Sequence, residues 1–158
     1  MTRELILLRH AHAEGGKPGE DDAQRPLDAR GVIEAKDAAS WLATHPKPTR
    51  ILCSPSLRTR ETLEYALPGA EPTMEPRIYD ATAGELMGLV DESFVGEDGG
   101  MERIMLVGHN PGFETFVALL VTGQSGDFRG MPPCGIAWIE LDDKVEPGAG
   151  KLKAFWAP

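Results

Sequence analysis

The strongest constraint on the fold of this chain is a pair of aliphatic runs that each end in a histidine. The first run spans Glu4–Leu8 and is followed by Arg9 and His10, and the second spans Ile104–Val107 and leads into His109. Short, nearly continuous aliphatic runs are typical of strands that are buried on both faces of a central sheet. The sequence therefore predicts two interior strands whose ends carry reactive side chains.

The rest of the chain alternates between strand and helix patterns. Further strands are predicted at Arg50–Cys53, Thr73–Ile78, Gly135–Leu141 and Lys151–Trp156, the third of these nearer an edge. Helices are predicted over Asp28–Thr44, after Pro55, after a capping box at Thr82 and Glu85, and from Pro111 behind an Asn110 cap. We expect an α/β fold: one domain over residues 1–158, a three-layer sandwich with a central, mostly parallel sheet and helices on both faces.

Composition narrows the classes of partner and the compartment. The chain has 158 residues, a formal net charge of -9 and two cysteines. This acidic balance argues against nucleic acid and against an anionic membrane as partners. Cysteines so few and so far apart, and no apolar stretch of membrane-spanning or signal-peptide length, predict a soluble cytoplasmic protein without disulfides.

The predicted strand ends gather residues that suit phosphate chemistry. In open α/β sheets, ligands bind outside the carboxyl ends of the strands, so Arg9, His10, Ser54 and His109 should line one edge of the sheet. Arg58 lies one turn into the following helix, where the helix dipole favours an anion. Two guanidiniums can each form a pair of hydrogen bonds to a tetrahedral oxyanion. Two histidines can supply a nucleophile and a proton donor or cationic stabiliser. We therefore predict a cationic phosphate site.

Plainer interpretations apply to each residue alone. A histidine at a strand end is more often a structural residue, and only the coincidence of two histidines and two arginines at one edge favours catalysis. His12 and His45 lack that setting, and we interpret them as surface residues. The pair of His10 and His12 could bind a metal, but a metal site needs further ligands. We therefore expect neither a metal nor another cofactor.

Three segments also carry a resemblance to a known family. Arg9-His10 resembles the Arg-His-Gly (RHG) signature of the histidine phosphatase (phosphoglycerate mutase-like) superfamily. Residues 54–62, SPSLRTRET, resemble its Ser-Pro-x-x-Arg-Ala-x-Gln-Thr segment, and residues 108–111, GHNP, resemble its Gly-His motif. The short chain, and Arg25-Pro26-Leu27 followed by Gly31, are most similar to the SixA-type phosphohistidine phosphatases. The ordered set covers nearly the whole chain.

The resemblance implies a phosphoglycerate mutase-like fold and a role for each matching residue. His10 would be the nucleophile that accepts phosphate, and Arg9, Arg58 and His109 would complete the phosphate pocket without a metal. A protonated His109 would stabilise the phosphate oxygens or assist the leaving group, and Arg25 would add a contact at the rim. Ala11, Thr59 and Glu61 depart from the family pattern, the latter two at positions that should not touch phosphate.

The general acid is the open question at the sequence level. Many members of the superfamily use a carboxylate after the third strand, and Asp80 is the nearest candidate, although a turn or cap residue explains it equally well. An alkoxide leaves poorly without a proton, whereas imidazole titrates near pH ~6.5 and leaves more easily. The sequence thus contains no clear general acid, and the chain is too short to build a lid over the site. Both observations favour phosphohistidine on a protein partner as the substrate. A phosphatase for small phosphate esters and a non-catalytic phosphate-binding module are the alternatives.

Overall fold

The computed structural model describes residues 3–94 and 102–158. The sequence also predicts a loop rich in Gly at 95–100, which lies outside the described residues. Within these ranges, six strands form one sheet in the order β3-β2-β4-β1-β5-β6. The strands are β1 (Arg3–Arg9), β2 (Arg50–Cys53), β3 (Thr73–Met74), β4 (Glu102–Gly108), β5 (Ile136–Leu141) and β6 (Gly150–Trp156). The helices are α1 (Ala29–Leu42), α2 (Leu57–Ala66), α3 (Ala83–Ser93) and α4 (Gly112–Thr122), with short 3-10 helices η1 (Asp22–Gln24) and η2 (Pro76–Ile78).

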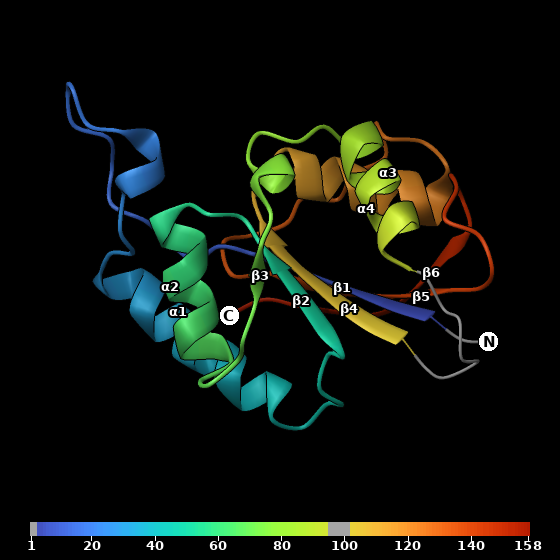
Figure 1. Ribbon diagram of the computed structural model, residues 1–158, viewed down its shortest axis with the longest axis horizontal. Helices are drawn as coiled ribbons and strands as arrows, with labels where there is room; N and C mark the ends of the chain where they lie inside the picture. Colours follow the sequence, from blue (N-terminus) through green and yellow to red (C-terminus); the bar gives the residue numbers. More distant parts are fainter. Residues whose placement is uncertain (1–2, 95–101) are drawn as a thin grey trace.

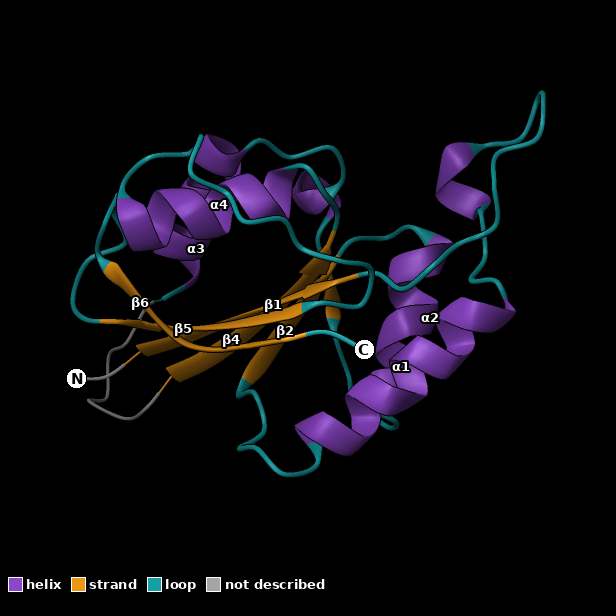
Figure 2. Cartoon of the chain, turned by 180° about the vertical axis from the view of Figure 1, so that it is seen from behind, coloured by secondary structure: helices purple, strands orange, loops and turns teal. Residues whose placement is uncertain are grey.

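The sheet is mostly parallel, as predicted. Strand β4 pairs in parallel with β1 and β2, and β2 pairs in parallel with β3. Strand β5 is antiparallel to both of its neighbours, β1 and β6. Helices α1 and α2 cover one face of the sheet, and α3 and α4 cover the other (Figures 1 and 2). The three-layer sandwich expected from the alternating pattern is confirmed.

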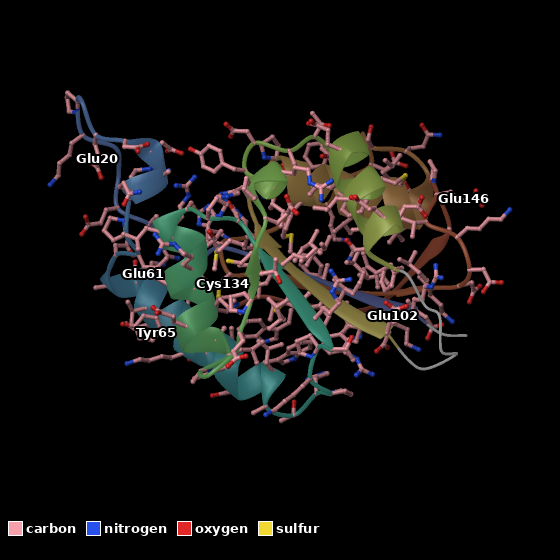
Figure 3. The ribbon with its side chains drawn as sticks, in the orientation of Figure 1. Glu20, Glu61, Tyr65, Glu102, Cys134 and Glu146 are labelled. Atoms are coloured by element: carbon pink, nitrogen blue, oxygen red, sulfur yellow. The ribbon has the colours of Figure 1, made fainter. Side chains whose placement is uncertain are left out.

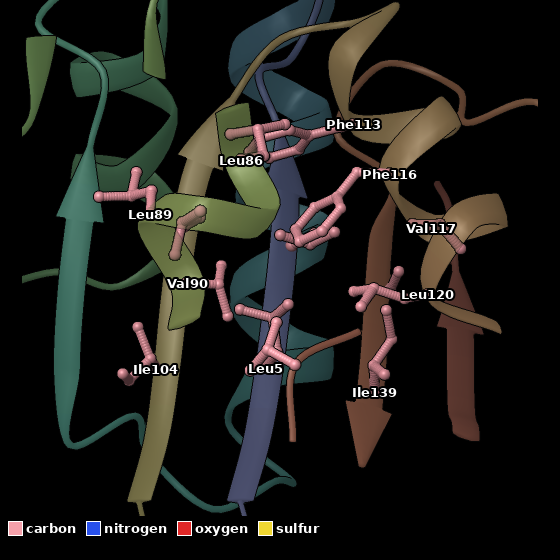
Figure 4. Packing of buried hydrophobic residues seen from close by; sticks show 14 of the residues in the cluster. Leu5, Leu86, Leu89, Val90, Ile104, Phe113, Phe116, Val117, Leu120 and Ile139 are labelled. Carbon is pink, nitrogen blue, oxygen red and sulfur yellow. The ribbon is translucent and has the colours of Figure 1, made fainter. Parts of the chain in front are cut away.

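The two aliphatic runs are buried on both faces because neighbouring residues of a strand point to opposite sides. Leu5 and Leu7 of β1 pack in the core beneath α3 and α4, whereas Ile6 and Leu8 pack in the core beneath α1 and α2. All four side chains are fully buried. In Figure 4, labelled residues of α3 and α4, among them Phe116, lie over Leu5 and its neighbours on the sheet. This burial fixes the register of β1, and hence the place where Arg9 and His10 leave the sheet.

N-cap side chains define where three of the helices begin. The side chain of Asp28 accepts a hydrogen bond from the Gly31 backbone N–H at 2.8 Å and caps α1. Ser56 caps α2 in the same way. Thr82 and Glu85 form the predicted capping box of α3, in which each side chain accepts the backbone N–H of the other residue.

Two expectations about the elements need correction. The strand predicted over Thr73–Ile78 ends at Met74, because Pro76 has no N–H to donate and begins η2 instead. Helix α4 begins at Gly112, with Pro111 in the N-cap position. The Asn110 carboxamide accepts the Glu114 N–H at 3.2 Å and donates to the Met131 carbonyl at 2.9 Å, so it ties two segments together. Strand β5 does lie second from an edge, yet it is almost wholly buried despite its alternating sequence.

No helix within the described ranges combines the length and the apolar character that crossing a membrane would require.

Candidate active site

The ends of three neighbouring parallel strands meet at one edge of the sheet. Arg9 at the end of β1 pairs with Gly108 at the end of β4, and the Ser54 N–H that follows β2 donates to the Val107 carbonyl at 3.0 Å. The rings of His10 and His109 consequently lie side by side, with their centroids 5.4 Å apart. The predicted shared edge is therefore confirmed.

An open cavity of about 450 Å³ lies at this edge. Its lining includes all six residues singled out from the sequence, namely Arg9, His10, Arg25, Arg58, Asp80 and His109. The remaining lining residues are His12, Ala13, Asn110 and Pro133. The described residues, those of the cavity included, contain no cluster of three His, Cys, Asp or Glu side chains that could hold a metal ion.

The hydrogen bond of His10 defines which ring nitrogen is free to react. Its Nδ1 lies 2.7 Å from the carbonyl oxygen of Ala11, which can only accept, so Nδ1 carries the proton and Nε2 keeps its lone pair. Burial lowers the pKa of His10 to about 4, and the charges of Arg58 and Arg9 act in the same direction. The ring is therefore neutral at neutral pH, with Nε2 available as a nucleophile.

The loop that carries His10 is tied to helix α2. The Ala11 N–H donates to Thr62 Oγ1 at 3.0 Å, and the same hydroxyl donates to the Arg58 carbonyl at 2.7 Å. Thr59 and Glu61 contact the backbone of Ser54 and Leu27, not the cavity, as expected for the two family departures. Thr62 thus joins the nucleophile loop to the helix that presents Arg58.

In both Arg9 and Arg58, some guanidinium nitrogens donate hydrogen bonds within the protein, while the Nε atom has no hydrogen-bond partner among the described residues. Arg9 Nη1 donates to the Met131 carbonyl at 2.7 Å, and Arg58 Nη1 and Nη2 donate to the Asp22 carbonyl and carboxylate at 2.8 and 3.1 Å. The Nε atoms of Arg9 and Arg58 are buried and make no hydrogen bond within the described residues. Burial lowers the pKa of Arg9, but a guanidinium stays charged at neutral pH. A buried donor without a partner costs about 1–3 kcal/mol, so an oxyanion that accepted these N–H groups would be stabilised.

Burial keeps His109 neutral in the protein alone, and the role of a protonated ring in the reaction stays a prediction. Its Nε2 lies 2.8 Å from Ser54 Oγ, and its Nδ1 is buried without a hydrogen-bond partner within the described residues. Burial lowers the pKa of His109 to about 3, with further lowering by His10 and Arg58. A phosphate dianion in the cavity would reverse part of this effect, because a negative charge favours the protonated ring.

Asp22 is a residue of the site that the sequence reasoning missed. Its carboxylate accepts hydrogen bonds from Arg58, from Arg25 Nε at 3.0 Å and from the Tyr79 hydroxyl. The Tyr79 hydroxyl is the main cause that lowers the pKa of Asp22, to about 2, with the two arginines adding to it. Asp22 begins η1, two residues after Glu20, which Figure 3 labels on the projecting segment of the chain. Only its position three residues before Arg25 hinted at this contact.

His12 was predicted to be a surface residue, and the structure corrects this. It lines the cavity, and its Nδ1 lies 2.7 Å from Oε2 of the buried Glu34 side chain. The other oxygen of Glu34 accepts the His12 backbone N–H at 2.9 Å. A Cβ on Gly31 would lie 2.0 Å from the His12 carbonyl oxygen, so only glycine lets α1 approach this closely. His45, by contrast, stacks on Trp41 outside the cavity.

The two remaining candidates, Asp80 and Arg25, lie at the rim of the cavity. Asp80 is exposed in the turn between η2 and α3, with a left-handed backbone (φ 57°) that aspartate tolerates better than most residues. Because Thr82 caps α3, Asp80 is not a cap residue. Arg25 donates to the Glu14 carbonyl at 2.8 Å as well as to Asp22.

Comparisons with known proteins agree with this geometry. A family model described as "Histidine phosphatase superfamily (branch 1)" matches residues 5–98. An uncharacterized protein of Mycobacterium tuberculosis (strain H37Rv) is 30% identical over 159 residues, which cover 93% of this chain and 98% of the relative.

Solved structures share the fold over nearly the full length. One is from an Agrobacterium tumefaciens protein proposed to be the phosphohistidine phosphatase SixA, with a TM-score of 0.79, 27% identity, and coverage of 98% of this chain and 97% of that chain. Another is a mycobacterial glucosyl-3-phosphoglycerate phosphatase, with a TM-score of 0.74 and 18% identity, covering 100% of both chains.

Proposed function

The chain belongs to the histidine phosphatase superfamily, and we propose that it removes phosphate from phosphohistidine on a protein through a covalent intermediate on His10. Three buried nitrogens without partners support the proposal: Nε of Arg9, Nε of Arg58 and Nδ1 of His109. All three residues line the cavity that also contains His10. A phosphoryl group supplies the acceptor oxygens that such nitrogens lack.

The first step transfers the phosphoryl group to the enzyme. Nε2 of His10 attacks phosphorus in line, so that a P–N bond to His10 forms while the P–N bond of the substrate breaks. Arg9 and Arg58 stabilise the charge on the equatorial oxygens, which supplies most of the catalysis in phosphoryl transfer. His109, once protonated by the approach of the dianion, binds the same oxygens.

The second step releases inorganic phosphate. Water attacks phosphorus opposite His10, the bond to Nε2 breaks, and the imidazole returns to the neutral form with its proton on Nδ1. The Ala11 carbonyl holds that tautomer throughout, so the nucleophile needs no rearrangement between turnovers. In this proposal the arginines provide the positive charge, and no metal takes part.

Two features favour phosphohistidine on a protein as the substrate. A phosphohistidine whose second ring nitrogen is protonated releases neutral imidazole, which leaves more easily than an alkoxide. The cavity is open to solvent, which suits a side chain presented by another protein. The similarity to the Agrobacterium protein points in the same direction.

A phosphatase for small phosphate esters is the second candidate. Asp80 borders the cavity, and its carboxyl group is the candidate that would protonate an alkoxide. The mycobacterial glucosyl-3-phosphoglycerate phosphatase shows that the same fold serves a small substrate. Pure phosphate binding is less well supported, because binding alone needs no histidine with a free Nε2.

The test is phosphate release from a phosphohistidine-containing protein in the presence of EDTA. We expect release by wild type and by His45→Ala, which removes a histidine outside the cavity, and none by His10→Ala. A para-nitrophenyl ester and a sugar phosphate assayed in parallel separate the candidates. Faster turnover of the sugar phosphate would favour the second candidate, and loss of all release in EDTA would contradict metal independence.

A further inference from the structure

A buried carboxylate holds a third histidine at the wall of the cavity. Glu34 lies inside α1 with its side chain only 10% exposed, whereas the His12 side chain is 32% exposed. Glu34 Oε2 lies 2.7 Å from His12 Nδ1, and Oε1 accepts the His12 backbone N–H at 2.9 Å. Both oxygens of the carboxylate are thus used to fix His12, whose Nε2 has no hydrogen bond among the described residues.

His12 differs from the other two cavity histidines in the kind of group that its ring contacts. His10 and His109 contact a carbonyl and a hydroxyl, and burial keeps both rings neutral. Among the three, His12 alone contacts a carboxylate, that of Glu34. A histidine whose far nitrogen is bound by a carboxylate can give up and recover a proton at its exposed nitrogen.

We propose that His12, oriented by Glu34, is the general acid and base of this site. The proposal rests on the phosphoryl transfer to His10 described above. In the first step the P–His10 bond forms and the bond from phosphorus to the leaving atom breaks. Where the leaving group carries no proton of its own, as in an alkoxide or an unprotonated imidazole, the proton on His12 Nε2 passes to the leaving atom. In the second step His12 Nε2 takes a proton from the attacking water as the bond from phosphorus to His10 breaks, which restores the starting state.

The positions of the two residues in the chain fit this assignment. His12 follows His10 after one intervening residue, Ala11, whose side chain is fully buried. Both histidines line the same cavity, so the nucleophile and the proton donor come from one short segment. Asp80, the carboxylate suggested by the sequence, is exposed in a turn and makes no side-chain hydrogen bond that orients it among the described residues.

Charged and titratable groups of α1 and of the cavity surround the pair formed by His12 and Glu34. On α1, Arg30 Nε lies 3.6 Å from Glu34 Oε2 and is largely exposed. Across the cavity lie the cationic or titratable groups Arg9, His10, Arg25, Arg58 and His109 and the carboxylate Asp80.

The decisive experiment compares leaving groups. Asparagine in place of His12 keeps an amide N–H for Glu34 but cannot transfer a proton. For an alkyl phosphate, we expect kcat/KM of His12→Asn to fall by about 10²–10⁴, the usual contribution of a general acid. For para-nitrophenyl phosphate, whose leaving group needs no proton, kcat/KM should stay within roughly threefold of wild type. The same fall on both esters, or no fall on either, would overturn the proposal.

Matched variants separate His12 from its rivals. His45→Asn removes a histidine outside the cavity and should leave both esters unaffected. A selective loss of alkyl phosphate activity in Asp80→Ala, with no such loss in His12→Asn, would assign the acid to Asp80 instead. Glu34→Gln keeps the shape but removes the carboxylate that orients His12, so kcat/KM should fall for the alkyl phosphate and stay near wild type for para-nitrophenyl phosphate. An equal effect on both esters would make Glu34 a structural residue only.

The test stays separate from that of the substrate class. A chain that hydrolyses both esters but not phosphohistidine refutes the proposed substrate and still allows the leaving-group comparison. For a chain that acts on phosphohistidine alone, the readout is the alkaline limb of the kcat/KM profile, which should disappear in His12→Asn. A limb that remains in that variant would overturn the role of His12.

Discussion

Replacing Thr62 with valine tests how the nucleophile loop is held. The Thr62 side chain is fully buried, and its hydroxyl accepts the Ala11 N–H at 3.0 Å and donates to the Arg58 carbonyl at 2.7 Å. Valine has nearly the same shape, so no cavity forms and the loss comes from unmade hydrogen bonds. A buried N–H left without a partner costs about 1–3 kcal/mol. At about 2 kcal/mol, Tm should fall by roughly 4–8 °C in a chain of this size.

We expect activity to fall together with stability, because Ala11 also holds the His10 ring through its carbonyl oxygen. The Ala11 carbonyl accepts the His10 Nδ1 proton, so a shifted peptide turns Nε2 away from phosphorus. We expect kcat/KM to drop by about tenfold or more, since small misplacements of reacting groups are costly.

The assay is urea denaturation with the slope m compared between variants, alongside steady-state kinetics. Thr122→Val is the matched control, because Thr122 Oγ1 also donates to a carbonyl, that of Ala118, and accepts a backbone N–H, that of Gln124. Thr122 is exposed, so that loss should be about 0.5 kcal/mol or less. If Thr62→Val cost no more than the control, the buried bridge would not hold the loop as described.

Three further predictions concern charge and close packing. Because burial lowers the pKa of His10 to about 4 and of His109 to about 3, the unfolded chain binds more protons below its ordinary histidine pKa of 6.5. The free energy of unfolding should therefore decrease as pH falls from 6.5 toward 4, and the decrease should be smaller in His10→Gln. Asp22→Asn keeps the backbone carbonyl that binds Arg58 but removes a negative charge, so inorganic phosphate should inhibit about two- to fivefold more tightly. Gly31→Ala forces a methyl group against the His12 carbonyl and should destabilise the fold by about 1–3 kcal/mol in urea denaturation.

Each of these has a clear contradictory result. NMR titration of the His10 ring with a midpoint near pH 6.5 would refute its burial as a neutral group. Weaker phosphate inhibition in Asp22→Asn would mean that the carboxylate positions Arg58 more than it competes with phosphate. A Gly31→Ala chain as stable as wild type would show that α1 can move away from His12.

Much of the fold was predictable because its signals are local. The uninterrupted aliphatic runs before His10 and His109 can be buried only in the middle of a sheet, and Asp28 and Thr82 mark helix starts through contacts three residues away. The strand predicted up to Ile78 was wrong because Pro76, two residues beyond the paired stretch, begins a 3-10 helix instead. Local patterns thus gave the elements and left some of their boundaries wrong.

The site was predictable where residues follow strand ends, and not where distant segments meet. His10 and His109 follow neighbouring parallel strands, so the topology alone brings them together. Asp22 reaches Arg58 and Tyr79 from 36 and 57 residues away, and no periodicity signals such contacts. The neutral state of His109 likewise depends on burial that the tertiary structure creates.

His12 is the clearest example of a cavity residue that sequence patterns could not identify. Its partner Glu34 is 22 residues away on α1, and in the sequence that glutamate is indistinguishable from a solvent-exposed helical residue. The close approach that buries it depends on Gly31, one turn earlier on the same helix. Sequence patterns alone therefore placed His12 on the surface.

The most direct test of the account is to trap the phosphoryl group on the enzyme. Wild-type protein would be mixed with a ³²P-labelled phosphohistidine protein, quenched in alkali within milliseconds, and mapped by mass spectrometry. We predict a phosphoryl group on Nε2 of His10, formed at least as fast as phosphate is released and missing from His10→Ala. Phosphate release at the wild-type rate with no labelled enzyme, or with the label on another residue, would contradict the central role of His10.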